Sequence, residues 1–159
     1  MNLFTIHHLA DRPEFIPVCA AWGYGEWGSQ LDDSSLGLAI ERFQKRSQKE
    51  HIPCTFVALA EEKPAGMISL IENNLKDTSD LSSRISSVFV HPTYRHKGFA
   101  HALLNRIEQE ALRLGIETLY LHTETAEGLY KAAGFLTIEA VSTKWGPGVL
   151  MNKRLIKDT

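Results

Sequence analysis

The sequence predicts an α/β domain in which strands and helices alternate and at least one pair of strands is parallel. Strand-like segments at 84–90 and 116–123 flank a stripe of apolar residues with helical spacing. A connection of this length, with its helix, is what two parallel neighbours in a sheet require. With 43% hydrophobic and 23% charged residues, the chain has the composition of a globular protein. Its length suits one domain, residues 1–159.

The start of the chain is expected to form a strand at 2–8 and a helix that begins near Pro13. Apolar residues between Phe15 and Trp22, spaced by three and four, form one face of this helix. Glycines at 23, 25 and 28 predict that the helix ends there, because glycine is a poor helix former. The resulting loop would hold an aromatic and acidic set, namely Tyr24, Glu26 and Trp27.

A second helix and a pair of strands follow. The helix is expected from about Ser34 to a point before Pro53, with Leu36, Ile40 and Phe43 facing inward. Strands at 54–60 and 65–71 enclose a turn, and a polar loop follows at 72–83.

The helix of the crossover connection has the clearest pattern in the chain. Gly115 is expected to end it. A short helix at 125–133 and strands at 135–144 and 149–155 complete the chain. The apolar stripe of the long helix is Ala100, Leu103, Leu104, Ile107, Ala111 and Leu114. The residues expected outside this stripe are His101, Asn105, Arg106, Glu108, Gln109 and Arg113.

Composition argues against several classes of function. A formal net charge of -2 provides no overall basic field, so no nucleic-acid partner is expected. The N-terminus lacks the parts of a signal peptide, and no run approaches the roughly 18 apolar residues of a membrane span. Cys19 and Cys54 fit a reducing compartment, and neither has a partner at metal-ligand spacing. We expect a cytoplasmic protein with no membrane contact and no metal.

The turn before the long helix has the chemistry of a phosphate site. A helix N-terminus exposes unpaired backbone N–H groups with partial positive charge, and Gly98 and Ala100 let a phosphate approach them. Arg95 and Lys97 add positive charge. The alternative is a glycine that only opens a helix beside solvated basic residues. The spacings of a nucleotide P-loop and of the three-glycine dinucleotide motif are both absent.

This segment, residues 88–100, resembles the acetyl-CoA-binding motif of the GNAT superfamily (Gcn5-related N-acetyltransferases). The motif is Gln or Arg, two residues, Gly, one residue, then Gly or Ala, and here it is Arg95 to Ala100. A second match is Tyr130 followed four residues later by Gly134 and Phe135. The order of elements resembles the family over nearly the whole chain.

The resemblance implies a mixed, mostly antiparallel sheet of 6–7 strands flanked by about four helices. Its fourth and fifth strands would splay apart around acetyl-CoA, and the pantetheine arm would pair with the fourth. Many relatives have glycine in place of His96 and asparagine in place of Thr123, whose hydroxyl can still form a hydrogen bond. The implied cofactor-binding residues are Val88, Phe89, Val90, Arg95, His96, Lys97, Gly98, Phe99, Ala100, Thr123 and Tyr130.

The family mechanism, carried over, is direct attack of an amine on the thioester. The Val90 N–H would donate to the thioester oxygen, which becomes anionic during the reaction. Tyr130 would protonate the departing thiolate, and its structural alternative is to pack a short helix on the sheet. Deprotonating a lysine-like amine at pH 7 costs about 4.6 kcal/mol, so a general base is valuable.

The identity of that base is open in the sequence. Many relatives carry a glutamate on the fourth strand, where this chain has only Ser86 and Ser87. Glu72 is the first substitute and Glu26 the second, and each has a solvated surface position as its alternative. Weaker candidates are Glu124 and His122.

The predicted function is N-acetyl transfer from acetyl-CoA to a primary amine of a basic small molecule or a peptide. Tyr24, Glu26 and Trp27 lie where the family places its acceptor-binding loop, and aromatic walls with a carboxylate suit a cationic amine. One alternative is a non-catalytic acetyl-CoA-binding sensor or interaction module. Another is an acyltransferase for longer acyl chains. Homodimers are common in such families, and the sequence identifies no interface.

Overall fold

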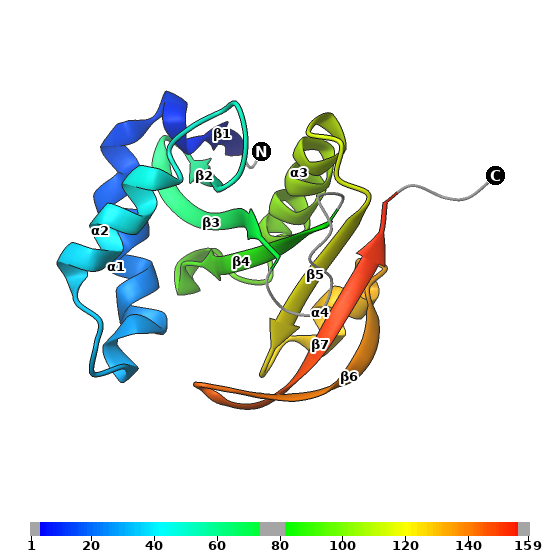
Figure 1. Ribbon diagram of the computed structural model, residues 1–159. Coiled ribbons are helices and arrows are strands. Elements are labelled where there is room, and N and C mark those ends of the chain that lie inside the picture. Colours follow the sequence, from blue (N-terminus) through cyan, green and yellow to red (C-terminus); the bar gives the residue numbers. More distant parts are fainter. Residues whose placement is uncertain (1–3, 74–81, 156–159) are drawn as a thin grey trace.

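The computed structural model describes residues 4–73 and 82–155. These residues form a seven-stranded sheet in the order β1-β2-β3-β4-β5-β7-β6 (Figure 1). The β4–β5 pair is parallel and the other neighbours are antiparallel, which confirms the predicted mixed sheet. The strands are β1 Phe4–His8, β2 Cys54–Ala60, β3 Lys63–Glu72, β4 Ser82–Val90, β5 Thr118–Thr123, β6 Leu136–Thr143 and β7 Gly146–Arg154.

Helices cover both faces of the sheet, with α1 and α2 on one side and α3 on the other (Figure 1). Side chains alternate between these faces along the central strands, as the pleat of a strand requires. On β2, Phe56 packs into the core beneath α3, whereas Val57 packs into the core beneath α1 and α2. The helices are α1 Ile16–Glu26, α2 Leu36–Lys45, α3 Phe99–Arg113 and α4 Glu127–Ala132. None of the helices in the described ranges is long and apolar enough to cross a membrane.

The first helix does not end at its glycines, and this corrects the sequence prediction. α1 continues through Gly23 and Gly25 to Glu26, so Tyr24 and Glu26 lie on a helix and not in a loop. A side chain on Gly23 would come within 3.1 Å of the Phe43 ring on α2. Glycine is therefore present because α1 and α2 pack closely, and that packing outweighs its low helix propensity.

Other differences concern side chains that the pattern placed wrongly. Leu36 was expected to face inward but is 45% exposed in the first turn of α2. Arg46, at the end of the same helix, is buried although it is charged. Arg106 was expected on the polar face of α3, but its guanidinium lies 4.3 Å from the centroid of the Phe56 ring. An arginine stem can cover apolar surface while its charged head contacts an aromatic ring.

Some boundaries also differ. β3 begins at Lys63, because the hairpin turn consists of two residues only, Glu61 and Glu62, both with positive φ. β4 begins at Ser82, two residues earlier than predicted. Most of the predicted polar loop, residues 74–81, lies outside the described residues.

The two parallel strands separate soon after they meet. Ser82–Arg84 pair with Thr118–Tyr120, and no further β4–β5 pair is formed. β4 nevertheless stays paired with β3 as far as Val90. A register irregularity in that ladder, with Ser87 at φ 56°, accompanies the separation. The gap leaves one edge of β4 without a strand partner beyond Arg84 (Figure 1).

Candidate active site

The free edge of β4 offers backbone groups to the gap. The His91 N–H donates to the Ala65 carbonyl on β3 at 2.8 Å. Successive N–H groups of a strand point in opposite directions, so the Val90 N–H points away from β3 and into the gap. The Phe89 side chain lies toward α1, where its ring centroid is 5.1 Å from that of Trp22. The edge therefore presents a backbone donor with an aromatic wall beside it.

The turn at the end of β4 leads into an uncapped helix. Gly98, at φ 89°, precedes the first residue of α3, Phe99, and no side chain caps the helix. A Cβ added at Gly98 would meet no atom within 4 Å, so the space in front of the turn is open. His96 has φ 62°, a left-handed conformation that usually favours glycine. The donors of the first turn are thus free for a diphosphate, and the residues fit that group.

Arg95 is held against the strand that precedes it. Its Nε donates to the Val90 carbonyl at 2.9 Å, and its guanidinium lies 5.8 Å from the Phe89 ring centroid. Lys97 extends over the Tyr94 ring, with 5.9 Å between Nζ and the ring centroid. Both cations therefore lie at the mouth of the gap.

Tyr130, on α4, belongs to the core beneath α3. The side chain is 6% exposed and packs edge to face on Phe135. Burial, and to a smaller extent the charge of Glu124, raise the pKa of Tyr130 to about 12. The phenol is therefore protonated at neutral pH and can act as a proton donor.

Thr123, expected to contact the pantetheine arm, also has a local role. Its Oγ1 accepts the Ala126 N–H at 2.9 Å and so shapes the entrance to α4. The hydroxyl proton is still available to a ligand, because this hydrogen bond uses only a lone pair.

The first two candidates for the base lie apart from the β4 edge. Glu72 is opposite Ser83, at the end of β4 that is paired with β5. Seven residues separate Ser83 from Val90, which is roughly 20 Å along a strand. Glu26 is exposed at the last residue of α1. The structure therefore does not bring Glu72 together with Val90.

A different pair of titratable residues occupies the end of β5. The Nδ1 of His122 lies 3.3 Å from a carboxylate oxygen of Glu124, and the imidazole stacks on Trp145 at 6.5 Å between centroids. The indole Nε1 of Trp145 donates to the Trp27 carbonyl at 3.0 Å. The turn between β6 and β7 is thereby tied to the end of α1 across the open end of the gap (Figure 1).

Sequence reasoning ranked His122 and Glu124 low and missed Trp145. The available signal was a tryptophan in a short turn, Lys144-Trp145-Gly146, where a large apolar side chain is unusual. The predicted acceptor residue Trp27 does lie in this group, through its backbone carbonyl.

A hollow of about 440 Å³ adjoins the end of β5. Its wall includes the carboxylates of Glu124 and Glu127, which also contact His122 and Lys131 respectively. Its other lining residues are Thr123, Thr125, Gly128, Pro147, Gly148 and Val149.

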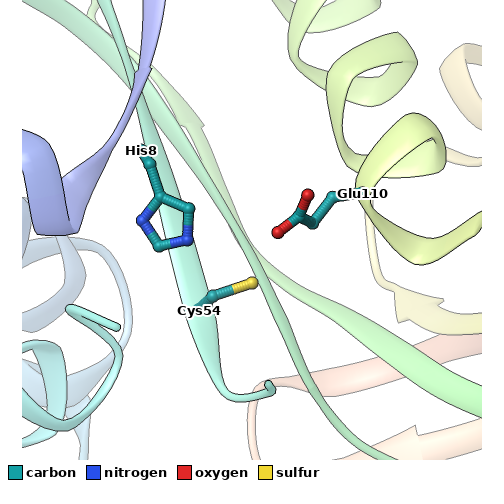
Figure 2. Close-up of side chains that lie close together, drawn as sticks. All are labelled: His8, Cys54 and Glu110. Carbon is teal, nitrogen blue, oxygen red and sulfur yellow. The ribbon is translucent and has the colours of Figure 1, made fainter. Parts of the chain in front are cut away.

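A buried cluster of metal-ligand type lies outside this site. His8, Cys54 and Glu110 come from β1, β2 and α3, and their side-chain donor atoms lie within 4.8 Å of one another (Figure 2). Both Glu110 oxygens already accept from Arg113, at 2.9 and 2.8 Å. Nδ1 of His8 accepts the Ala10 N–H, which places the proton of the neutral ring on Nε2. Burial raises the pKa of the Cys54 thiol to about 12, so without a metal ion the thiol stays protonated at neutral pH.

Glu110 is expected to contribute to the stability of the protein in a pH-dependent way. Its hydrogen bonds with Arg113 lower the pKa of Glu110, so this stability is present above the unfolded-state pKa and is lost as the pH falls through the lower folded-state pKa. Glu110→Gln should lower the free energy of unfolding by about 1–2 kcal/mol at pH 7. The difference from wild type should shrink below about pH 4. Urea unfolding between pH 3 and 7 measures it.

Glu41→Gln, at an exposed position of α2, is the matched control for that experiment. A difference between wild type and Glu110→Gln that stays constant down to pH 3 would contradict the prediction.

The splayed sheet and the uncapped turn on its gap define a class of protein, the acetyltransferases that use acetyl-CoA. The model described as the Acetyltransferase (GNAT) family matches residues 19–135, more than half of the sequence. The chain therefore belongs to the GNAT acetyltransferase family. The predicted family, fold, enzyme class and acetyl donor are confirmed.

Solved structures share this fold over almost the entire chain. An aminoglycoside 6'-N-acetyltransferase in complex with coenzyme A is 16% identical, with a TM-score of 0.78 over 98% of this chain and 99% of that one. The yncA protein of Salmonella typhimurium with acetyl-CoA is 21% identical, with a TM-score of 0.74 over 98% and 95%. The aminoglycoside 6'-N-acetyltransferase of Enterococcus faecium is 16% identical, with a TM-score of 0.76 over 98% and 99%. At these identities the likeness establishes the fold. A search of curated protein sequences gave no match.

Proposed function

We propose that this protein transfers the acetyl group of acetyl-CoA to a primary amine by direct attack in the gap between β4 and β5. The observation that carries the proposal is the early end of β4–β5 pairing, at Arg84 and Tyr120. It leaves the β4 edge free next to the uncapped start of α3. Two of the matched structures, which share the fold, contain coenzyme A or acetyl-CoA.

In this proposal backbone groups hold the donor. The diphosphate lies on the N–H groups of the turn at 95–100, with Arg95 and Lys97 nearby. The pantetheine arm pairs with the edge at 88–90, and the Val90 N–H donates to the thioester oxygen. A donor already aimed at that oxygen stabilises the negative charge that develops there.

Tyr130 gives a proton to the departing thiolate. Its raised pKa, about 12, keeps the proton on the phenol until the thiolate forms. A thiol with a pKa near 8.5 is already a fair leaving group, so this help should lie at the lower end of the usual range for a general acid, about 100-fold.

We assign the general base to His122 in preference to Glu72 and Glu26. Its Nδ1 faces the Glu124 carboxylate, which leaves Nε2 as the basic nitrogen. Glu72 lies at the paired end of β4, and Glu26 is exposed at the end of α1. Trp145 stacks on the imidazole and limits its orientation.

His122→Gln is expected to lower kcat/KM about 30-fold at pH 7, with little change in acetyl-CoA affinity. The loss should shrink above about pH 9, where more of the amine is already neutral. Release of free thiol, followed over pH 6–10, measures this. Glu72→Gln is the discriminating partner, and we expect its activity within about twofold of wild type. The reverse ranking of the two variants would show that Glu72 is the base.

The function itself is tested by calorimetric titration with acetyl-CoA, followed by thiol release with a panel of amines. Binding and turnover together support the proposal. Binding without turnover on any amine would favour the alternative, a sensor or interaction module, which the lack of a carboxylate at Ser86 and Ser87 leaves open.

A further inference from the structure

Two arginines lie on the α2 side of the sheet, where β4 and β5 separate. Arg84 is the last β4 residue paired with β5, opposite Tyr120. Its neighbour Ile85 packs in the core beneath α3, so the Arg84 side chain points to the other face. Arg46 reaches the same face from the end of α2 and contacts β3 and β4. The two guanidinium groups thus approach one region from different elements.

The contacts of Arg46 are all uncharged. Its Nη1 donates to the hydroxyls of Ser69 and Ser87, at 3.2 and 3.0 Å, and its Cζ lies 4.9 Å from the Phe43 ring centroid. The residue is only 8% exposed. Burial, together with the charges of Arg42 and Arg84, lowers the pKa of Arg46 to about 10, so it remains a cation at neutral pH.

The charge of Arg84 is offset by fewer polar contacts than that of Arg46. Its Nε is buried and has no hydrogen-bond partner, and burial lowers the pKa of Arg84. Within residues 4–73 and 82–155, no carboxylate forms an ion pair with Arg46 or Arg84. Charges removed from water are costly unless they are paired. Arg46 is buried and Arg84 is half-buried, and the charge of Arg84 acts on Arg46, so an anion near both groups would offset this cost.

The position of this pair relates it to the reaction. Ser87, which Arg46 contacts, directly precedes the edge residues at 88–90. Ser87 and Val90 are three positions apart, about 10 Å along a strand, and Arg84 and Val90 are six positions apart, about 20 Å. His122 lies on the facing strand, on the same side as Tyr120 and opposite the buried Leu121. A molecule whose amine is near His122 would place a substituent several bonds away against the arginines.

We propose that Arg46 and Arg84 bind a carboxylate of the acceptor, so that the acceptor is a primary amine with an acid group several bonds away, as lysine has between its ε-amine and its carboxylate. This inference rests on the proposed function and narrows its substrate class. An arginine fork matches the two oxygens of a carboxylate, and the bound acid would hold the amine at a defined place beside the thioester.

The test compares each of the common L-amino acids with its own carboxamide as acceptor, by release of free thiol from acetyl-CoA. At least one amino acid should exceed its amide at least 30-fold in kcat/KM. Arg84→Gln should bring the kcat/KM of the amino acid to within about threefold of that of its amide. It should also leave the acetyl-CoA dissociation constant within about threefold of the wild-type value. Arg42→Gln, an exposed arginine on α2, is the matched control and should keep the wild-type ratio.

Arg46→Lys is a second variant that retains a cation in the buried position. Because lysine lacks the fork, the ratio of acid to amide should fall while the protein stays folded. If both Arg84→Gln and Arg46→Lys keep the wild-type preference for the amino acid over its amide, the proposal is overturned.

Three other outcomes would also overturn it and would locate the error. If amines without an acid group are acetylated as efficiently as amino acids, the protein is an acetyltransferase but has no carboxylate site. A preference of wild type for succinyl-CoA that Arg84→Gln abolishes would assign the arginines to the acyl chain. If acetyl-CoA binds but no amine is acetylated, the carboxylate site is tested by calorimetry. The affinity of the CoA complex for N-acetyl amino acids is then compared with its affinity for their amides. Equal or absent binding of the acids then refutes the site.

Discussion

Replacing Gly98 with aspartate is expected to raise the dissociation constant for acetyl-CoA at least 100-fold, or about 2.7 kcal/mol. The glycine precedes α3, and no side chain uses the N–H groups of the first turn. An aspartate would accept from these groups, occupy the open space in front of them and repel the diphosphate. Calorimetric titration with acetyl-CoA measures the loss.

Gly115→Asp is the control, because it changes a glycine at the opposite end of the same helix. Gly115 has φ 80° and no atom within 4 Å of an added Cβ, so both variants experience similar backbone strain in similar open space. Gly115→Asp should lower the melting temperature more than Gly98→Asp, because its charge lies at the negative end of the helix dipole, but only Gly98→Asp should lose affinity. Wild-type affinity in Gly98→Asp would mean that the diphosphate binds elsewhere, and the proposed donor site would fail.

Tyr130→Phe is expected to lower kcat about 100-fold while the affinity for acetyl-CoA stays within about threefold. The phenylalanine ring retains the contact with Phe135 and loses only the hydroxyl. Because burial raises the pKa of Tyr130 to about 12, the hydroxyl is protonated at both pH 7 and pH 9. The fold-reduction should therefore be the same at these two values, and steady-state thiol release tests it.

Phe135→Leu separates the chemical from the structural role of Tyr130. It disturbs the same ring contact but keeps the hydroxyl, so we expect a lower melting temperature and a kcat within about threefold of wild type. If Tyr130→Phe also lowers the melting temperature but leaves kcat unchanged, the tyrosine only packs α4 onto the sheet.

The parts of the site that local sequence could predict are those formed by contiguous residues. The turn from Arg95 to Ala100, the strand before it and the helix after it are encoded within one short segment, and the structure has this arrangement. His96 is informative, because its positive φ shows why a non-glycine residue there is a departure. The residues that we propose for the acceptor side, His122, Glu124 and Trp145, come from separate segments, and no local motif relates them.

The glycines of α1 and the buried Arg46 show why patterns mislead. Gly23 predicts a helix break by propensity, yet its lack of a side chain is what admits the Phe43 ring of α2. Arg46 lies on the inward side of an amphipathic helix, where a charged residue contradicts the pattern. In both cases a neighbouring element decided the outcome, and its position is not visible in the local sequence.

By itself the sequence determined the α/β class, the crossover helix, the turn before it and the family, since each depends on periodicity or on a short motif. Only the tertiary structure decided where β4 and β5 separate and which groups meet in the gap. The hydrogen bond from Trp145 to Trp27 joins residues 118 positions apart, and Arg46 meets Ser87 across 41. Such contacts depend on how the twisted sheet and its helices pack, because packing brings together side chains that no local spacing relates.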